Sequence, residues 1–328
     1  MANIALLNRC NLRCPYCFAD SYIASEKEDI TMEAFYSLLN FCAYERELGI
    51  IGGEPLLHKE FDKILDVLNT DYRFNTITVF TNGIFIDKHI EKLLCSRVRL
   101  LINVNSKEDI GQANFDKIDS GIKKYFDAHM DDRISLGVNV YKEGQSFDDI
   151  CYLLEKYGIK RLRVSVVIPK DKSEGGINYF LRMKKTLLSL YEKLKALGVS
   201  PYYDCNAIPW CVYTKEETEL LESLDFDSQF EREIFLGKRS VCSPVIDIYP
   251  DMSATRCFGC YSMAKADVRD FKNIQDLKNY FFMEIDARLV HNYSYDRCKD
   301  CYNHKVFGCF GGCLCYATVG SNPLCIEK

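Results

Sequence analysis

The sequence lacks the features that mark membrane, secreted and nucleic-acid-binding proteins. No apolar run reaches the roughly eighteen residues that a transmembrane helix needs. Residues 1–9 contain no basic region followed by a long apolar core, so they do not form a secretion signal. The net charge of −5 over 328 residues gives no basic field for nucleic acid or an acidic membrane surface. We therefore expect a cytoplasmic protein that binds neither nucleic acid nor membrane.

The sequence also contains no internal repeat and no low-complexity segment. Its five histidines are scattered along the chain and form no motif. The hydrophobic fraction of 48% and the charged fraction of 27% are those of a globular protein. The length allows one large or two modest domains.

Cysteine, in contrast, is abundant, with 17 residues. Eight of them lie between Cys242 and Cys315, and Cys325 follows. A disulfide framework is typical of small secreted chains, whereas this chain is long enough to build a core. Ligation of metal ions or clusters in a reducing compartment is the better interpretation.

Apolar patterning predicts an α/β fold over residues 1–200. Strands are expected at residues 3–7, 49–51, 76–81, 98–104, 134–141 and 161–168. Helices are expected at residues 31–48, 61–68, 88–95, 115–128, 147–157 and 178–197, with Gly49 as the residue that ends the first. Strands that alternate with helices form a parallel sheet. We place a domain boundary near residues 200–206 and a smaller, cysteine-rich domain at residues 201–328.

The first cysteines form the most informative motif, Cys10-x3-Cys14-x2-Cys17, with Tyr16 before the last cysteine. Three thiolates can hold three irons of a four-iron cluster and leave the fourth iron open, which is where a substrate or cofactor binds. A zinc site or a redox dithiol would need only a C-x2-C pair. Neither explains the third cysteine and Tyr16.

Polar residues also follow the other predicted strands, where chemistry collects in parallel α/β folds. They comprise Gly52, Gly53, Glu54 and Pro55 after the second strand, Thr81, Asn82 and Gly83 after the third, Asn103 and Asn105 at the fourth, Asn139 in the fifth and Ser165 in the sixth.

The three-cysteine motif, followed one strand–helix unit later by Gly-Gly-Glu-Pro, resembles the radical S-adenosylmethionine (radical SAM) family. The resemblance implies a partial, six-stranded (β/α)6 barrel. It also implies that a four-iron cluster on Cys10, Cys14 and Cys17 reductively cleaves S-adenosylmethionine (SAM) to a deoxyadenosyl radical, which abstracts hydrogen from a substrate. Tyr16 would lie near the adenine. Residues 52–55 would lie near the methionyl group, because glycines without Cβ let the backbone approach a ligand closely and the exposed amides and carbonyls there can bond it. Asn103 and Asn105 would lie near the ribose or carboxylate, and Asn139 and Ser165 elsewhere in the cofactor site.

The C-terminal cysteines resemble the SPASM extension of radical SAM enzymes that modify peptides. This resemblance implies two auxiliary four-iron clusters and hence three clusters in total. One would be held by Cys298, Cys301, Cys309 and Cys325. The other would be held by Cys242, Cys257 and Cys313, with Cys211, Cys260 or no protein group as its fourth ligand. The sequence departs from the pattern at Met252, where the family has glycine, and in the longer loop between Cys301 and Cys309. A zinc module is the alternative, because Cys257-x2-Cys260 and Cys298-x2-Cys301 have zinc spacing.

The expected activity is oxidoreductive maturation of a ribosomally made peptide by crosslinking, oxidation or epimerisation. Cys205 and Cys211 are candidate hydrogen donors for an epimerisation, although a structural or ligand role is the simpler interpretation. Because the barrel begins near Met1, we expect a peptide that is short, is held by the barrel mouth itself, or is delivered by a separate leader-recognition protein. We expect an external donor such as flavodoxin or ferredoxin to supply electrons. The alternatives are a radical SAM dehydrogenase or epimerase of an aminocyclitol or sugar, and a non-catalytic metal-binding protein.

Overall fold

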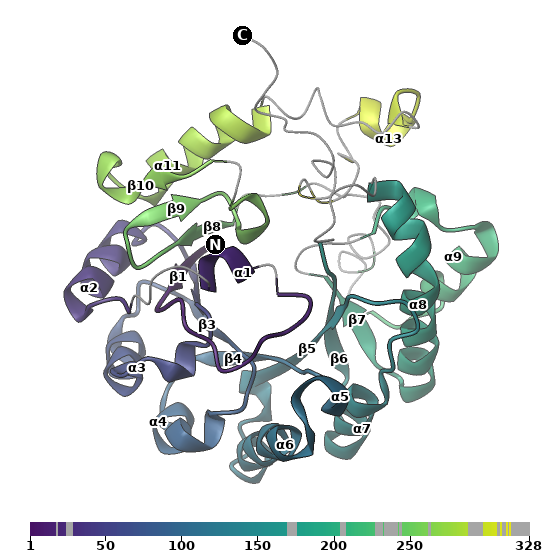
Figure 1. The fold of residues 1–328 in the computed structure, drawn as a ribbon, viewed down its shortest axis with the longest axis horizontal. Helices are drawn as coiled ribbons and strands as arrows, with labels where there is room; N and C mark the ends of the chain where they lie inside the picture. Colours follow the sequence, from purple (N-terminus) through teal and green to yellow (C-terminus); the bar gives the residue numbers. More distant parts are fainter. Residues whose placement is uncertain are drawn as a thin grey trace. The chain divides into compact units, whose positions relative to one another are not determined.

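Parallel strands that alternate with helices make up most of the chain, which confirms the predicted α/β class (Figure 1). The computed structural model describes residues 1–17, 19–23, 29–168, 176–203, 208–226, 232, 242, 245–261, 264–287, 298–306, 309, 313 and 315. Within this part of the chain, none of the helices has the length and apolarity needed to cross a membrane.

The chain forms two compact units, each made of two stretches of sequence. Unit 1 comprises Met1–Leu136 and Pro244–Glu284, and unit 2 comprises Gly137–Ser243 and Ile285–Lys328. Part of the predicted C-terminal domain therefore folds together with the N-terminal residues. The functional division at residue 200 stays a prediction.

The sheet of unit 1 has the strand order β10-β9-β8-β1-β2-β3-β4. Strands β1 to β4 pair in parallel, and β8 pairs in parallel with the other edge of β1. Strands β9 and β10 continue the sheet in antiparallel pairs. The bounds are β1 Ala2–Ala5, β2 Glu47–Ile51, β3 Thr76–Thr81, β4 Arg99–Asn103, β8 Ile246–Ile248, β9 Ser253–Thr255 and β10 Ala266–Asp267.

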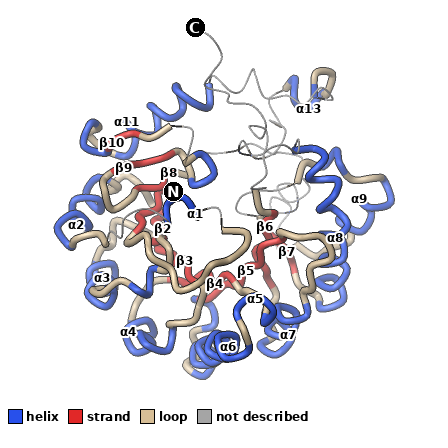
Figure 2. Tube along the Cα trace, in the orientation of Figure 1, coloured by secondary structure: helices blue, strands red, loops and turns tan. Residues whose placement is uncertain are grey.

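Helices α2, α3, α4 and α6 lie along one side of strands β1 to β4 (Figures 1 and 2). The α-helices of unit 1 are α1 Asp20–Ile23, α2 Met32–Phe41, α3 Phe61–Thr70, α4 Ile90–Cys95, α5 Lys107–Ile110, α6 Gln112–Asp127 and α11 Ile274–Phe281. The 3-10 turns are η1 Pro55–Leu57, η2 Ile86–His89, η3 Asp131–Arg133, η5 Phe258–Cys260 and η6 Val268–Asp270, and the π-helical turn η7 Phe282–Asp286 follows α11. The sequence predicts the apolar face of α3 correctly, since Phe61, Ile64, Leu65 and Leu68 are all buried.

The first long helix is shorter than predicted, and its proposed C-terminal glycine lies in a strand. Helix α2 ends at Phe41, where the Cys42 amide donates to the Leu38 carbonyl and the Ala43 amide donates to the Asn40 carbonyl. Gly49 lies inside β2 opposite Asn3 of β1. A Cβ at Gly49 would lie 1.9 Å from Asn3 Oδ1, so glycine is required there by the asparagine across the sheet.

Unit 2 contains helices α7 Asp148–Tyr157 and α8 Gly176–Leu197 and the parallel strands β6 Arg161–Val166 and β7 Ser200–Tyr202. The seventh strand was not predicted. Strand β5, Ile134–Val140, begins in unit 1 and ends in unit 2. The remaining elements of unit 2 are η4 Trp210–Val212, α9 Lys215–Glu222 and α13 Tyr302–Lys305.

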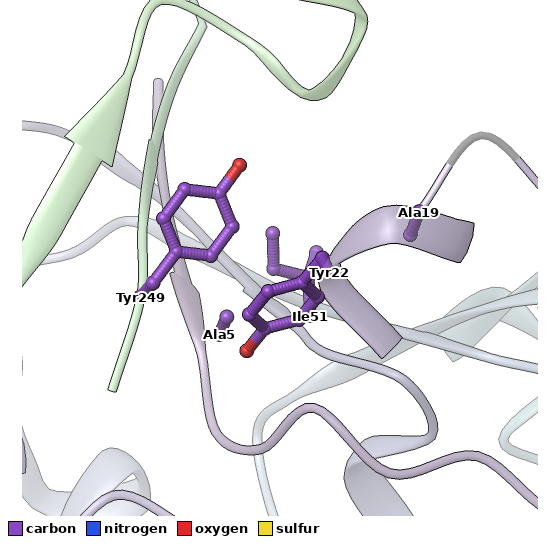
Figure 3. Packing of buried hydrophobic residues seen from close by; sticks show 5 residues of the cluster. All are labelled: Ala5, Ala19, Tyr22, Ile51 and Tyr249. Atoms are coloured by element: carbon purple, nitrogen blue, oxygen red, sulfur yellow. The ribbon is translucent and has the colours of Figure 1, made fainter. Parts of the chain in front are cut away.

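An aromatic cluster joins four segments of unit 1, and we call it the Tyr22 cluster (Figure 3). The Tyr22 and Tyr249 rings lie 4.8 Å apart between centroids. The cluster's buried members are Ala5, Ala19, Tyr22, Ile51 and Tyr249. Cys17 and Phe258 pack against it, so residues next to both cysteine-rich segments share one apolar core.

Candidate metal centre

The three-cysteine motif lies on the loop that leaves the C-terminal end of β1, as predicted (Figure 1). The Cys17 amide donates to the Cys14 carbonyl at 3.0 Å, which makes a tight turn of the C-x2-C pair. The Leu12 amide lies 3.4 Å from Cys10 Sγ and can donate to it. Amide donors of this kind stabilise a thiolate and tune the potential of a cluster bound to it.

The three thiols lie within electrostatic range of one another. Burial raises the pKa of Cys10 to about 11 and that of Cys14 to about 12. Cys17 contributes to both shifts, and Cys10 contributes to that of Cys14. Without a metal the two thiols are therefore protonated at neutral pH, and a cation would have to displace their protons. A half-buried set of three soft ligands on one loop fits an iron–sulfur cluster with one open position.

Asn105, two residues beyond β4, binds the cysteine loop. Its Oδ1 accepts from the Tyr16 hydroxyl and lies 3.6 Å from Cys14 Sγ. Its Nδ2 lies 3.4 Å from the Asn103 carbonyl. The structure thus brings together Tyr16, Asn103 and Asn105, which the sequence places at one edge of the sheet.

The two glycines after β2 accommodate the backbone of the cysteine loop. A Cβ at Gly53 would lie 2.1 Å from the Arg9 carbonyl oxygen, and one at Gly52 would lie 2.6 Å from the Leu7 carbonyl oxygen. The Gly53 amide donates to Leu7, and the Glu54 amide donates to Arg9. These amides were expected to face a ligand, yet both donate hydrogen bonds to the protein's own backbone.

Glu54 holds the loops after β1, β2 and β3 in one arrangement. Its carboxylate accepts from the Leu56 amide at 3.1 Å, Thr81 Oγ1 at 2.7 Å and the Asn82 amide at 2.8 Å. The side chain is fully buried, and this burial raises its pKa to about 7 despite the three donors. Pro55 begins the 3-10 turn that follows. Glu54 thus acts on the site by positioning backbone.

Of three further side chains that hold the cysteine loop in place, sequence reasoning singled out only Asn82. Asn82 Nδ2 donates to Asn11 Oδ1 at 2.9 Å. Arg9 forms an ion pair with Asp29, and His58 binds the Ile30 carbonyl. Only Asn82 carried a signal, as part of the polar run after β3. The partners of Arg9 and His58 are 20 and 28 residues away, and no spacing rule connects them.

The two predicted cofactor residues of unit 2 lie on strands. Asn139 in β5 accepts from Arg163 through Oδ1 at 3.2 Å and from Gln145 through its carbonyl oxygen at 2.9 Å. Ser165 is buried in β6. Their role in cofactor binding stays a prediction.

The C-terminal cysteines are described in part. Cys257 and Cys260 Sγ lie 3.6 Å apart on the turn that leads into η5. Two thiolates on one tetrahedral metal with 2.3 Å bonds would be about 3.8 Å apart. Since each iron of a four-iron cluster takes one cysteine, this spacing favours a single metal ion at the pair and keeps the zinc alternative open.

In unit 2, the Cys301 amide donates to Cys298 at 3.1 Å, and the Cys309 amide donates to Asn303 at 3.1 Å. Cys298 and Cys313 are buried, Cys242 is half-buried, and Cys211 is exposed in η4. Cys205 and Cys325 lie outside the described residues.

Comparison with known proteins agrees with these features. The Radical SAM superfamily profile matches residues 4–156. A GTP 3',8-cyclase of Staphylococcus aureus is 28% identical over 181 residues, which cover 50% of this chain and 52% of the relative. The chain therefore spans about half the length of that curated relative.

Two solved structures share the fold over nearly the whole chain. SuiB from Streptococcus suis, bound to its precursor peptide SuiA, has a TM-score of 0.58 at 17% identity and covers 96% of this chain and 71% of SuiB. The protein anSMEcpe, bound to AdoMet and the Kp18Cys peptide, has a TM-score of 0.66 at 18% identity, with coverage of 95% and 88%.

Proposed function

We propose that this chain, whose residues 4–156 match the Radical SAM superfamily profile, is a radical SAM enzyme that modifies a peptide. The observation that carries the proposal is that Cys10, Cys14 and Cys17 lie on one loop, which is bound by residues from the ends of β2, β3 and β4. These thiolates would hold a four-iron cluster, whose contribution when bound would be the single electron that cleaves SAM to methionine and a deoxyadenosyl radical, and that radical would take a hydrogen atom from the substrate.

The protein's own residues would hold and orient these groups. Cys10, Cys14 and Cys17 would each bind one iron. The Leu12 amide would donate to the Cys10 sulfur. Asn105 and Tyr16 are hydrogen-bonded to each other beside Cys14. When SAM binds, both side chains would give up this hydrogen bond and form hydrogen bonds to the nucleoside of SAM instead. Glu54 and Asn82 would keep the loops in register.

A peptide substrate is supported by the fold shared with SuiB and anSMEcpe, both solved with peptides. The C-terminal cysteines support a second metal-binding region of the SPASM type, which would bind substrate or pass on an electron. Cys298, Cys301, Cys309, Cys313 and Cys325 remain its proposed ligands, together with Cys242 and Cys257.

The GTP 3',8-cyclase relatives supply the competing substrate class, a small phosphorylated nucleoside. Their match covers only half of this chain, whereas the peptide-bound structures resemble 95–96% of it. This difference favours the peptide.

Hydrogen transfer to the cleaved cofactor tests the proposal. Anaerobically reconstituted protein would be given dithionite, SAM and a pool of short peptides from cells grown in heavy water. Deuterium in the 5'-deoxyadenosine product, measured by mass spectrometry, is the expected result. Deuterium transfer from ribose-deuterated GTP and none from the peptide pool would favour the nucleotide. Absence of 5'-deoxyadenosine in all mixtures would contradict the proposal that this chain is a radical SAM enzyme.

A further inference from the structure

The loop that carries Cys10, Cys14 and Cys17 is closed at its base by contacts between residues on either side of it. The Ile30 amide donates to the Leu6 carbonyl at 2.8 Å, and Leu7 and Asp29 form an antiparallel bridge. The chain thus leaves β1, carries the motif and returns beside its starting point. Loops with adjacent ends of this kind are compact units that frequently carry function.

An ion pair lies at this closure, directly beside the first cysteine. Arg9 Nε lies 3.0 Å from Asp29 Oδ1, and Arg9 Nη2 lies 2.5 Å from Asp29 Oδ2. The side chains are 33% and 19% exposed, so solvent screens the pair less than a surface pair. Paired, parallel bonds of this type fix geometry as well as adding free energy. Because Arg9 adjoins Cys10, the pair fixes where the motif begins.

His58 fixes the returning strand of the loop. Its Nδ1 accepts from the Glu60 amide at 3.2 Å, so the ring proton resides on Nε2, which donates to the Ile30 carbonyl at 3.0 Å. The ring is almost fully buried. Through this ring, the residue after Asp29 is tied to the segment that follows η1.

The far side of the motif is anchored by apolar packing. Ala19 and Tyr22 belong to the Tyr22 cluster, and Cys17 packs against it (Figure 3). Residues 10–17 therefore lie between a polar closure and an apolar anchor. A loop fixed at both ends loses less conformational entropy when three of its side chains converge on one ligand.

We propose that Arg9, Asp29 and His58 are positioning residues that preorganise the three-cysteine loop before any metal binds. We call these three residues the loop clamp. This inference rests on the proposed function only in that the loop's ligand is an iron–sulfur cluster. The clamp itself is a property of the metal-free chain.

Tryptic cleavage after Arg13, an exposed residue between Cys10 and Cys14, tests the clamp in the full chain without metal. Asp29→Asn removes the ion pair, and His58→Phe keeps the ring volume but removes both of its hydrogen bonds. We expect each substitution to speed cleavage after Arg13 about tenfold, because local opening governs proteolysis. Asp71→Asn is the matched control, since Asp71 forms the same paired contact with Arg73 away from the loop.

The same variants would then be reconstituted, and iron retention against a chelator would be measured. Faster iron loss in the Asp29→Asn and His58→Phe proteins than in Asp71→Asn is the expected result. Cleavage after Arg13 at the wild-type rate in both clamp variants would overturn the inference, whatever their iron content. A wild-type protein that binds no iron, with cleavage still accelerated in the variants, would instead contradict the proposed function and leave the clamp intact.

Discussion

At the scale of single residues, the sequence predicts where the chemistry lies better than how each side chain acts. The positions of Cys10, Cys14, Cys17 and Glu54 follow from motif and strand order, and the structure places them on adjoining loops. The glycines beside Glu54 were interpreted as making room for a ligand. They make room for the Leu7–Cys10 backbone, a contact that a one-dimensional pattern does not contain.

Gly53→Ala should therefore destabilise the protein by about 3 kcal/mol, because its Cβ would overlap the Arg9 carbonyl, which is backbone and moves only with the cysteine loop. Urea unfolding of the metal-free chain measures this loss. Gly144→Ala is the control: its Cβ meets nothing within 4 Å, and only its φ of +66° costs about 1 kcal/mol. Equal losses in the two variants would show that the close approach at Gly53 does not exist.

Glu54 should make stability depend on pH. Its folded pKa of about 7 lies above the ordinary value of 4.5, so the folded state holds a proton that the unfolded state releases. The unfolding free energy should therefore fall as pH rises from about 4.5 through 7, by at most about 3 kcal/mol from this group.

Glu54→Gln cannot ionise and should flatten that part of the pH profile. Its amide nitrogen cannot accept a hydrogen bond from Thr81 or Asn82, so its stability should be lower at pH 5 by about 1–3 kcal/mol. Unfolding free energies at pH 5, 6, 7 and 8 give both quantities. A variant profile parallel to that of the wild type would assign the slope to other groups.

At the scale of elements, long amphipathic helices, continuous apolar strands and two short strands of unit 1 were predictable. The buried face of α8 repeats over several turns and was predicted, including Phe180, Met183 and Leu187. The runs at residues 245–249 and 254–256 are typical of strands, and β8 and β9 lie there to within one residue. Strand β7 was not predicted: it has three residues and is defined by pairing with β6, from which a long helix separates it, so local pattern does not reveal it.

Strand β2 was predicted at residues 49–51 and begins two residues earlier, at Glu47, because the helix before it was predicted too long. Gly49 was placed after a helix because glycine commonly ends helices. In the structure its missing Cβ leaves space for Asn3, whose Nδ2 donates to Asp247 of β8 at 2.6 Å. Gly49→Ala should displace the Asn3 side chain, break this link between β1 and β8, and destabilise the chain by about 2–3 kcal/mol.

A double-mutant cycle separates this effect from general strain in β2. Asn3→Ala removes the atom that the new methyl group would meet, so Gly49→Ala should cost at least about 1 kcal/mol less in that background than in the wild type. Urea unfolding of the four proteins provides the comparison. An unchanged cost in the Asn3→Ala background would mean that Asn3 is not the reason for glycine.

At the scale of the whole molecule, the order of segments in sequence differs from their grouping in space. Residues 244–284 belong to the same compact unit as the three-cysteine loop, and Phe258, next to Cys257, packs on the Tyr22 cluster together with Cys17. The change in amino-acid composition near residue 200 indicates that a segment of different character begins there. It does not indicate which of the earlier strands the later residues will pair with.

This arrangement raises the question of whether the two cysteine-rich regions bind metal independently. Cys10, Cys14 and Cys17 are held by loops after β1 to β4, whereas Cys257 and Cys260 lie on a turn after β9 that is positioned by its own backbone bonds. Replacing the first three cysteines with Ala should abolish reductive SAM cleavage and leave the C-terminal metal in place. Iron, zinc and sulfide per chain, together with 5'-deoxyadenosine formation, measure both outcomes.

The metal count also decides between the two interpretations of the C-terminal region. Three four-iron clusters require about twelve irons in the wild type, falling to about eight in the triple variant. About four irons plus zinc in the wild type, and zinc alone in the triple variant, would identify the C-terminal region as a zinc module. The 3.6 Å separation of the Cys257 and Cys260 Sγ atoms favours a single metal ion at that pair. Loss of all metal from the triple variant would contradict independent sites, and the shared Tyr22 cluster would then be the structural link through which one region depends on the other.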